Sequence, residues 1–234
     1  MKEANNKKNI AVVIGSSGGV GSGLYNSLRD EDEYDAVMGF HRNSKPAIDV
    51  TNEKSVKEVA KFIIEKEYKI SLLVNAVGYL HDVDFYPEKK VEDLNDEYLK
   101  KSFSINTFST AFLLKYFTPI MFKNKRSLFV SISARVGSIE DNYLGGWYSY
   151  RASKSALNQL IKTASIEFKR KKSNIIFLSL HPGTVDTKLS KPFSNKKKLF
   201  STSLAAKKIL KTLNNASAEQ SGSLIDYDGN IIPF

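Results

Sequence analysis

One glycine-rich segment near the N-terminus restricts the fold more than any other stretch of the sequence. It follows a short apolar run, residues 10–14, which is rich in β-branched side chains and typical of a buried strand, and a helical pattern through Leu24 and Leu28 comes after it. Between a strand and a helix, glycines let the backbone turn tightly and approach a pyrophosphate, whose charge then meets the amides at the start of the helix. We therefore interpret the segment as a phosphate-binding turn rather than a flexible loop. Its candidate contacts are Gly15, Ser17, Gly19, Val20 and Gly21.

Strand and helix patterns alternate along the rest of the chain. Apolar runs predict strands at residues 36–40, 70–74, 128–132 and 174–180. Apolar residues at helical spacing predict helices at residues 53–66, 98–122, 150–168 and 204–213, and the tail 222–230 predicts a closing strand and turn. This alternation predicts one α/β domain over residues 1–234, with a doubly wound, mostly parallel sheet and helices on both faces, the Rossmann fold. Ligands of such a sheet bind at the carboxyl ends of its strands.

Tyr150 and Lys154 form a candidate catalytic pair. They lie four residues apart at the start of the predicted helix that continues to Phe168, so both side chains project from one helix face. A neighbouring ammonium favours the phenolate and is expected to lower the pKa of the tyrosine from its ordinary value of about 10. Such a tyrosine can donate a proton to a carbonyl oxygen and take it back from an alcohol. The spacing alone is common by chance, and it gains weight from the segments around it.

The end of the second predicted strand bears on the choice of cofactor. Dinucleotide-binding folds that use NAD usually carry an acidic residue there, which bonds the ribose 2′-hydroxyl. This chain has His41 and Arg42 instead, with Lys45 close by in the sequence. A guanidinium suits a 2′-phosphate, so the sequence favours NADP(H) over NAD(H), and an ordinary exposed arginine is the alternative.

Composition excludes several classes of protein. The chain has no cysteine, so it holds neither a disulfide nor a thiolate metal site, and we expect no metal. Its N-terminus is polar and its apolar run at residues 111–122 is broken by Lys115 and Pro119, which favours a cytoplasmic protein without a membrane segment. Its net charge is +10, with basic clusters at residues 169–172 and 196–198, and no recognisable nucleic-acid motif accompanies them. We therefore expect a solvated basic surface that draws an anionic cofactor, and no nucleic-acid partner.

Further motifs complete a pattern that resembles the short-chain dehydrogenase/reductase family over nearly the whole chain. The family's glycine motif is matched at Gly15, Gly19 and Gly21, with Ile14 in place of a threonine. Its other motifs are matched by Asp49-Val50, Asn75-Ala76-Val77-Gly78, Asn106, Tyr150 with Lys154, and Pro182-Gly183-Thr184-Val185-Asp186-Thr187. Residues 137–142, 145–154 and 226–229 narrow the resemblance to the branch of C-factor-like and sniffer-like carbonyl reductases.

The resemblance implies an NADP(H)-dependent reduction of a small-molecule carbonyl compound to an alcohol. Tyr150 would protonate the carbonyl oxygen, Lys154 would lower the pKa of Tyr150 and hold the nicotinamide ribose, and Asn106 would hold a water for proton relay. Thr187 would bond the nicotinamide carboxamide. The other implied cofactor contacts are His41, Arg42, Asp49, Val50, Asn75, Ala76, Gly78, Pro182, Gly183 and Val185. A homodimer or homotetramer through the long helices is a further expectation.

One position departs from the family pattern. The family serine that hydrogen-bonds the substrate carbonyl falls on Ala134 of this chain. Ser133 is the replacement we expect, provided that the strand ends or bulges before it, and Ser138 or no serine at all are the alternatives. The missing serine also keeps open a second class of function, an NADP-binding signalling or redox-sensing protein with weak or vestigial reductase activity.

Overall fold

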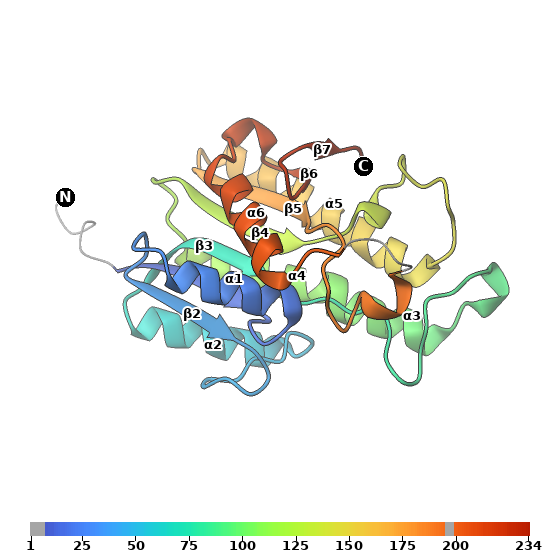
Figure 1. Cartoon of the computed structure of the whole chain (residues 1–234). Coiled ribbons are helices and arrows are strands. Elements are labelled where there is room, and N and C mark those ends of the chain that lie inside the picture. The colour runs from blue at the N-terminus through green and yellow to red at the C-terminus, as the bar shows by residue number, and fades with distance from the viewer. Residues whose placement is uncertain (1–7, 195–198) are drawn as a thin grey trace.

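The computed structural model of the protein describes residues 8–194 and 199–234. The predicted lysine cluster at residues 196–198 and the polar segment 1–7 lie outside the described residues. A seven-stranded sheet runs through the molecule in the order β2-β1-β3-β4-β5-β6-β7 (Figure 1). The strands are β1 (Asn9–Ile14), β2 (Ala36–Phe40), β3 (Lys69–Asn75), β4 (Ser127–Ile132), β5 (Ile175–His181), β6 (Ser223–Asp226) and β7 (Ile231–Ile232).

The sheet is parallel except at one edge, where β6 and β7 pair antiparallel. The chain runs from β1 outward to β2 and then crosses back to β3 on the other side of β1, so the direction of winding reverses between β1 and β3. In doubly wound sheets the ligand site lies at the carboxyl ends of the strands beside this reversal. The predicted fold class is therefore confirmed.

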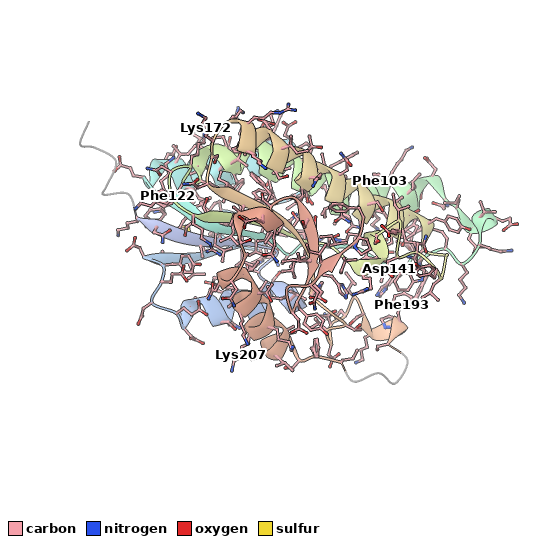
Figure 2. The ribbon with its side chains drawn as sticks, turned by 90° about the horizontal axis from the view of Figure 1, so that it is seen from above. Phe103, Phe122, Asp141, Lys172, Phe193 and Lys207 are labelled. Atoms are coloured by element: carbon pink, nitrogen blue, oxygen red, sulfur yellow. The ribbon has the colours of Figure 1, made fainter. Side chains whose placement is uncertain are left out.

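Helices cover both faces of the sheet (Figure 1). They are α1 (Gly19–Arg29), α2 (Glu53–Glu65), α3 (Asp96–Phe103), α4 (Ser109–Phe117), α5 (Tyr148–Arg170) and α6 (Thr202–Asn214). Figure 2 shows α6, marked by Lys207, on one side of the sheet and the end of α5, marked by Lys172, on the other. Within the described residues no helix combines the length and the apolar character needed to cross a membrane.

Strand β1 shows how the two faces are filled. Successive side chains of a strand point to opposite sides, so one apolar run serves two cores. Ile10, Val12 and Ile14 pack with the apolar faces of α2, α4 and α5. Ala11 and Val13 pack with those of α1 and α6. A strand that is buried on both sides needs a continuous apolar run, which is the pattern seen in the sequence.

The long helix predicted at residues 98–122 is not a regular α-helix throughout. The chain forms α3, a π-helical turn at Ser104–Phe108 and α4, and it ends in a 3-10 turn at Thr118–Ile120. The helical path therefore stops short of its predicted end, at a turn that contains Pro119, a residue without a backbone N–H. The π-helical turn contains Asn106. Such turns occur often at functional sites, so the interruption draws attention to this residue.

Candidate active site

The turn after β1 is built by glycines at positions where no other residue fits. Gly15 has a φ of +83°, a left-handed conformation that residues with a Cβ rarely adopt. A Cβ on Gly21 would collide with the carbonyl oxygen of Gly15. The Gly15 amide donates a hydrogen bond of 2.7 Å to the carbonyl of Phe40, the last residue of β2. This bond therefore holds the glycine turn against the end of β2, at the carboxyl ends of the two strands.

The start of α1 fits an anionic group such as a pyrophosphate. Gly18 precedes the helix, no side chain of the described residues caps it, and the first helical turn carries no acidic residue. Amides in this arrangement attract negative charge. Ser17 is exposed and Val20 is half-buried. Gly19 lies against the methyl group of Thr187, which places the predicted carboxamide contact directly over the turn.

The residues after β2 differ in how they are held. His41 is half-buried, and its Nδ1 accepts a hydrogen bond of 3.2 Å from a main-chain amide two residues on. Arg42 is exposed, and its guanidinium has no partner within residues 8–194 and 199–234. Asp49 is also exposed, with its Oδ1 accepting from the Thr51 amide at 2.9 Å, whereas Val50 is buried. Arg42 is thus available to an anion next to the glycine turn.

The loop after β3 is joined to the same edge. The Ala76 amide donates to the Ile14 carbonyl at 2.9 Å. The Asn75 side chain is buried, its Nδ2 donates to the Thr110 hydroxyl at 3.2 Å, and its Oδ1 accepts from the Val77 amide at 3.2 Å. These bonds fix the course of the loop as it leaves the sheet.

Gly78 marks the point where this loop meets the predicted catalytic residues. A Cβ on Gly78 would lie 3.8 Å from Nζ of Lys154 and 3.9 Å from Oδ1 of Asn106. The Asn106 side chain is fully buried and holds the next residue of the loop by its main chain. Its Oδ1 accepts from the Tyr79 amide at 2.8 Å, and its Nδ2 donates to the Tyr79 carbonyl at 2.9 Å.

Asn106 also reaches α5. Its Nδ2 donates to the Ser153 hydroxyl at 3.0 Å, and that hydroxyl donates to the Tyr150 carbonyl at 2.8 Å. The side chain therefore connects the loop after β3 with the first turns of the helix. Its expected part in holding a water for proton relay stays a prediction.

Tyr150 and Lys154 project from the first two turns of α5 into one site. Nζ of Lys154 lies 5.8 Å from the centre of the Tyr150 ring. Nζ also donates to the Ile132 carbonyl, at the end of β4, at 2.9 Å. Both residues are buried, with exposed fractions of 7% for Tyr150 and 2% for Lys154. An ammonium has three donors, so two remain for hydroxyl groups such as those of a ribose.

Burial shifts the pKa values of both members of the pair toward their neutral forms. It raises the pKa of the Tyr150 phenol, with a smaller contribution from Tyr98. It lowers the pKa of Lys154 to about 7. The shift at Tyr150 is opposite to the lowering expected from a neighbouring ammonium. The reason is that the phenolate loses its hydration on burial, and this cost outweighs the effect of the neighbouring Lys154.

No serine stands at the family position after β4. The Ser133 hydroxyl donates to Oδ1 of Asn158, on α5, at 2.7 Å. Ala134 follows in an extended conformation, so its methyl group points away from the side that Ser133 faces. Ser138 is buried, and its Oγ accepts from the Asp141 amide at 2.9 Å. The role of Ser133 as a donor to a carbonyl stays a prediction, because its proton already has a partner.

The segment after β5 closes the site on the side of the glycine turn. Gly183 has a φ of +78°, and a Cβ there would lie 2.8 Å from the Tyr227 ring. Pro182 is half-buried and Val185 is buried. The Thr187 amide donates to a serine hydroxyl three residues on, at 3.2 Å. This close packing brings Thr187 from the end of β5 back over α1.

An aromatic cluster beside Tyr150 was not predicted. The Trp147 ring lies 6.1 Å from the Tyr150 ring and 5.0 Å from the Phe193 ring. The His81 ring lies 5.3 Å from Phe193 and 5.5 Å from Tyr86. In Figure 2, Phe193 lies toward the end of the molecule opposite the C-terminus of α5. Trp147 lies in the motif at residues 145–154, but no sequence pattern joined it to the other rings, because the cluster comes from three segments that are far apart in the chain.

Known proteins resemble this chain in sequence and in fold. A family model described as short chain dehydrogenase matches residues 9–198. The 1-hydroxy-2-glutathionyl-2-methyl-3-butene dehydrogenase of Rhodococcus sp. (strain AD45) is 28% identical, with 95% of this chain and 98% of that protein covered. The carbonyl reductase Sniffer of D. melanogaster has a TM-score of 0.84 at 22% identity, with 98% of this chain and 100% of that chain covered. The NADPH-bound carbonyl reductase from chicken fatty liver has a TM-score of 0.83 at 22% identity, with 97% and 94% covered.

Proposed function

Because this chain belongs to the short-chain dehydrogenase family and is an oxidoreductase, we propose that it uses NADPH to reduce a carbonyl compound to an alcohol, with Tyr150 as the proton donor. The observation that carries the proposal is the arrangement at the start of α5, where Nζ of Lys154 lies 5.8 Å from the Tyr150 ring. A Cβ on Gly78 would touch that Nζ at 3.8 Å, so the absence of a side chain keeps the approach to Lys154 from being narrowed. The names of the relatives from chicken and D. melanogaster, both carbonyl reductases, support the reaction class.

The proton would move through residues of this chain. Bound NADPH would supply a hydride to the carbonyl carbon. Tyr150 would give its phenolic proton to the carbonyl oxygen, which completes the alcohol. Lys154, whose pKa burial lowers to about 7, would then restore the proton of Tyr150. Its remaining donors would hold the ribose hydroxyls.

The preference for NADPH is proposed from Arg42. Its guanidinium is exposed and unpaired among the described residues, at the end of a strand that is tied to the glycine turn by the Gly15 amide. A phosphate on the adenosine ribose would give it a charge-assisted partner, with His41 beside it. A ribose hydroxyl would not.

The aromatic cluster is proposed as one wall of the substrate site. Trp147 packs edge-on against Tyr150, so a substrate that reaches the phenol also meets the cluster. Flat apolar surfaces favour a carbonyl compound with an aromatic or otherwise apolar body. Phe193 and His81 extend this wall away from the reacting group.

A carbonyl panel tests the proposed function. Purified protein with NADPH is offered aldehydes, quinones and diketones, and the absorbance of the reduced cofactor is followed. We expect turnover with at least one class. Tight binding of NADPH without turnover on any class would contradict the reductase and favour the alternative, an NADP-binding signalling or redox-sensing protein. Ala134 is the observation that supports this alternative, because it provides no hydroxyl at the family position.

Self-association through the long helices stays a prediction. The charged residues that line the groove between α4 and α5 are mostly basic: Lys115, Lys123, Lys171 and Lys172, with Glu167 as the one acid. Like charges on the two copies would oppose pairing through this face at low salt. Light scattering at rising salt concentration would show whether a dimer or tetramer forms.

A further inference from the structure

The first turn of α5 needs hydrogen-bond acceptors that its own residues do not supply. The amides of a first helical turn have no partner inside the helix. Trp147 occupies the capping position with left-handed backbone angles, φ 54° and ψ 41°, and its side chain forms no cap. Residues 148–151 include no acid. Because this turn carries Tyr150, whatever satisfies its amides also fixes the proposed proton donor.

Glu88, in the loop between β3 and α3, supplies these acceptors. Its carboxylate accepts from the Ser149 amide, at 3.3 Å to Oε1 and 3.2 Å to Oε2, and also from the Ser149 hydroxyl. Its main-chain carbonyl accepts from the Trp147 amide at 2.5 Å. One residue thus holds the chain on both sides of the start of α5.

The burial of Glu88 shows that this contact is specific. The residue is only 3% exposed, and no cation among the described residues forms an ion pair with it. A buried carboxylate is costly unless hydrogen bonds and a nearby positive charge compensate for its lost hydration. Here the compensation comes from Ser149 and from the positive end of the dipole of α5.

A second tie lies on the other side of Tyr150. Ser153 donates to the Tyr150 carbonyl and accepts from Asn106, and Asn106 holds the main chain of Tyr79. The loop that carries Glu88 is therefore bound to α5 both before and after Tyr150. A displacement of this loop would therefore move Tyr150 through either of the two ties.

We propose that Glu88 is a positioning residue for the proposed reaction, fixing the first turn of α5 and with it the direction of the Tyr150 hydroxyl. The inference rests on the proposed function, because it takes Tyr150 as the proton donor. Proton transfer needs donor and acceptor within hydrogen-bond distance, and a displacement of about 1 Å can cost roughly 100-fold in rate. Loss of the carboxylate should therefore lower kcat, while the glycine turn and Arg42 continue to bind the cofactor.

Two substitutions separate the charge from the contact. Glu88→Gln keeps the size of the side chain and one acceptor oxygen but removes the charge, and we expect kcat to fall roughly 10-fold. Glu88→Ala removes the side-chain contact entirely, and we expect a fall of roughly 100-fold. In both variants the KM and Kd for NADPH should stay within about twofold of wild type.

Asn52→Ala is the matched control. Asn52 caps α2, with its Oδ1 accepting from the Lys54 amide at 3.0 Å, and that helix carries no catalytic candidate. Asn52→Ala removes a helix cap, so it should lower the Tm, as the loss of the Glu88 carboxylate from the start of α5 should. It should leave kcat at saturating NADPH unchanged. A fall in kcat that accompanies any loss of stability would appear in this control and overturn the inference.

Hydrogen exchange of the protein without cofactor gives a readout that is independent of turnover. In Glu88→Gln and Glu88→Ala we expect faster exchange in residues 147–153 and unchanged exchange in α2. Unchanged exchange at 147–153 would overturn the inference. Tyr150→Phe is measured in parallel. If Tyr150→Phe abolishes reduction while both Glu88 variants keep the wild-type kcat, the positioning role alone is wrong. If Tyr150→Phe keeps the wild-type rate, the proposed function itself is wrong.

Discussion

The site at the carboxyl ends of the strands has two halves that reach their geometry by different means: a backbone half around β1 and β2, and a side-chain half around β4 and α5. Around β1 and β2 the backbone does the shaping, because Gly15 and Gly21 occupy positions that exclude a Cβ, and the exposed Arg42 extends from this frame. Around β4 and α5 the shape depends on buried side chains, such as Lys154 and Asn106, that bond to distant parts of the chain. A change in the first half should therefore alter one cofactor contact, whereas a change in the second should disturb a connected network.

Tyr150→Phe should have the largest effect on activity of the substitutions in the side-chain half. It is a clean test, because it removes one oxygen and almost no volume. We expect carbonyl reduction to fall by roughly 10²–10⁴-fold, since the proton donor is lost. The Kd for NADPH, measured by fluorescence titration, should stay within about twofold. Tyr148→Phe is the matched control, because Tyr148 lies in the same helical turn but is 40% exposed. A large loss in Tyr148→Phe with none in Tyr150→Phe would show that the donor has been misassigned.

Ser133→Ala asks whether this half contains a second donor to the carbonyl. If Ser133 fills that role, kcat/KM should fall by roughly 10²–10³-fold. The same change leaves Oδ1 of Asn158 without its donor, so the free energy of unfolding should also fall by about 1–3 kcal/mol.

Ser138→Ala, assayed on the same substrate, separates the two serines. We expect it to stay within a fewfold of wild type. A large loss in Ser138→Ala alone would move the assignment there, and near-wild-type rates in both variants would mean that Tyr150 acts without a serine.

Arg42→Ala tests the backbone half, where a single contact should be lost. We expect the affinity for NADPH to fall by about 10- to 100-fold, which corresponds to about 1.5–3 kcal/mol for a charge-assisted hydrogen bond. The affinity for NADH should not change, so NADH serves as the internal control in the same titration. Equal affinities of the wild-type protein for the two cofactors would refute the proposed preference.

The pH dependence of stability tests the burial of Lys154, on the side-chain half. Its pKa is about 7 in the folded protein and 10.5 ordinarily, so between these values the unfolded chain binds more protons. The free energy of unfolding without cofactor should therefore rise with pH, by up to about 1.4 kcal/mol per unit between about pH 7.5 and 9.5. Lys154→Met should remove this slope in urea unfolding experiments.

Other groups act outside this window. The raised pKa of Tyr150 lowers stability only above about pH 10, the ordinary pKa of tyrosine. The pKa of His181 is lowered to about 4 by burial, so its contribution rises between that value and 6.5 and is complete below the window. A slope that persists in Lys154→Met would mean that another buried group carries it.

The same contrast explains how much could be predicted from the sequence. The unit of β1, the glycine turn and α1 is contiguous in the chain, so its local pattern was sufficient to predict it. Tyr150 and Lys154 were found for a similar reason, because one helical turn brings them together. The doubly wound, mostly parallel sheet followed from the alternation of strands with helices, although the order of the strands and the short strand β7 were not predicted.

The parts that the sequence did not reveal depend on tertiary contacts. Glu88 meets Ser149 across 61 residues, and no local pattern announces such a pair. The aromatic cluster joins Trp147 to Phe193 in the same way. The pKa of Tyr150 was predicted to be lowered, and it is raised instead. Burial sets the direction of this shift, and the spacing of two residues in the sequence does not reveal burial.

The π-helical turn at Ser104–Phe108 makes the number of residues in this helix a feature of the site. An α-helix rotates by about 100° per residue, so a turn with one additional residue sets α3 and α4 out of phase by about that angle. This offset lets Tyr98 on α3 be buried, with its hydroxyl donating to the Leu80 carbonyl at 2.7 Å, while Phe117 on α4 is buried too. Deleting one residue from the turn would yield a more regular helix and swing Tyr98 and Asn106 out of register with α4. The helix would become more regular, but the loop after β3 would lose the hydrogen bonds by which Asn106 holds it.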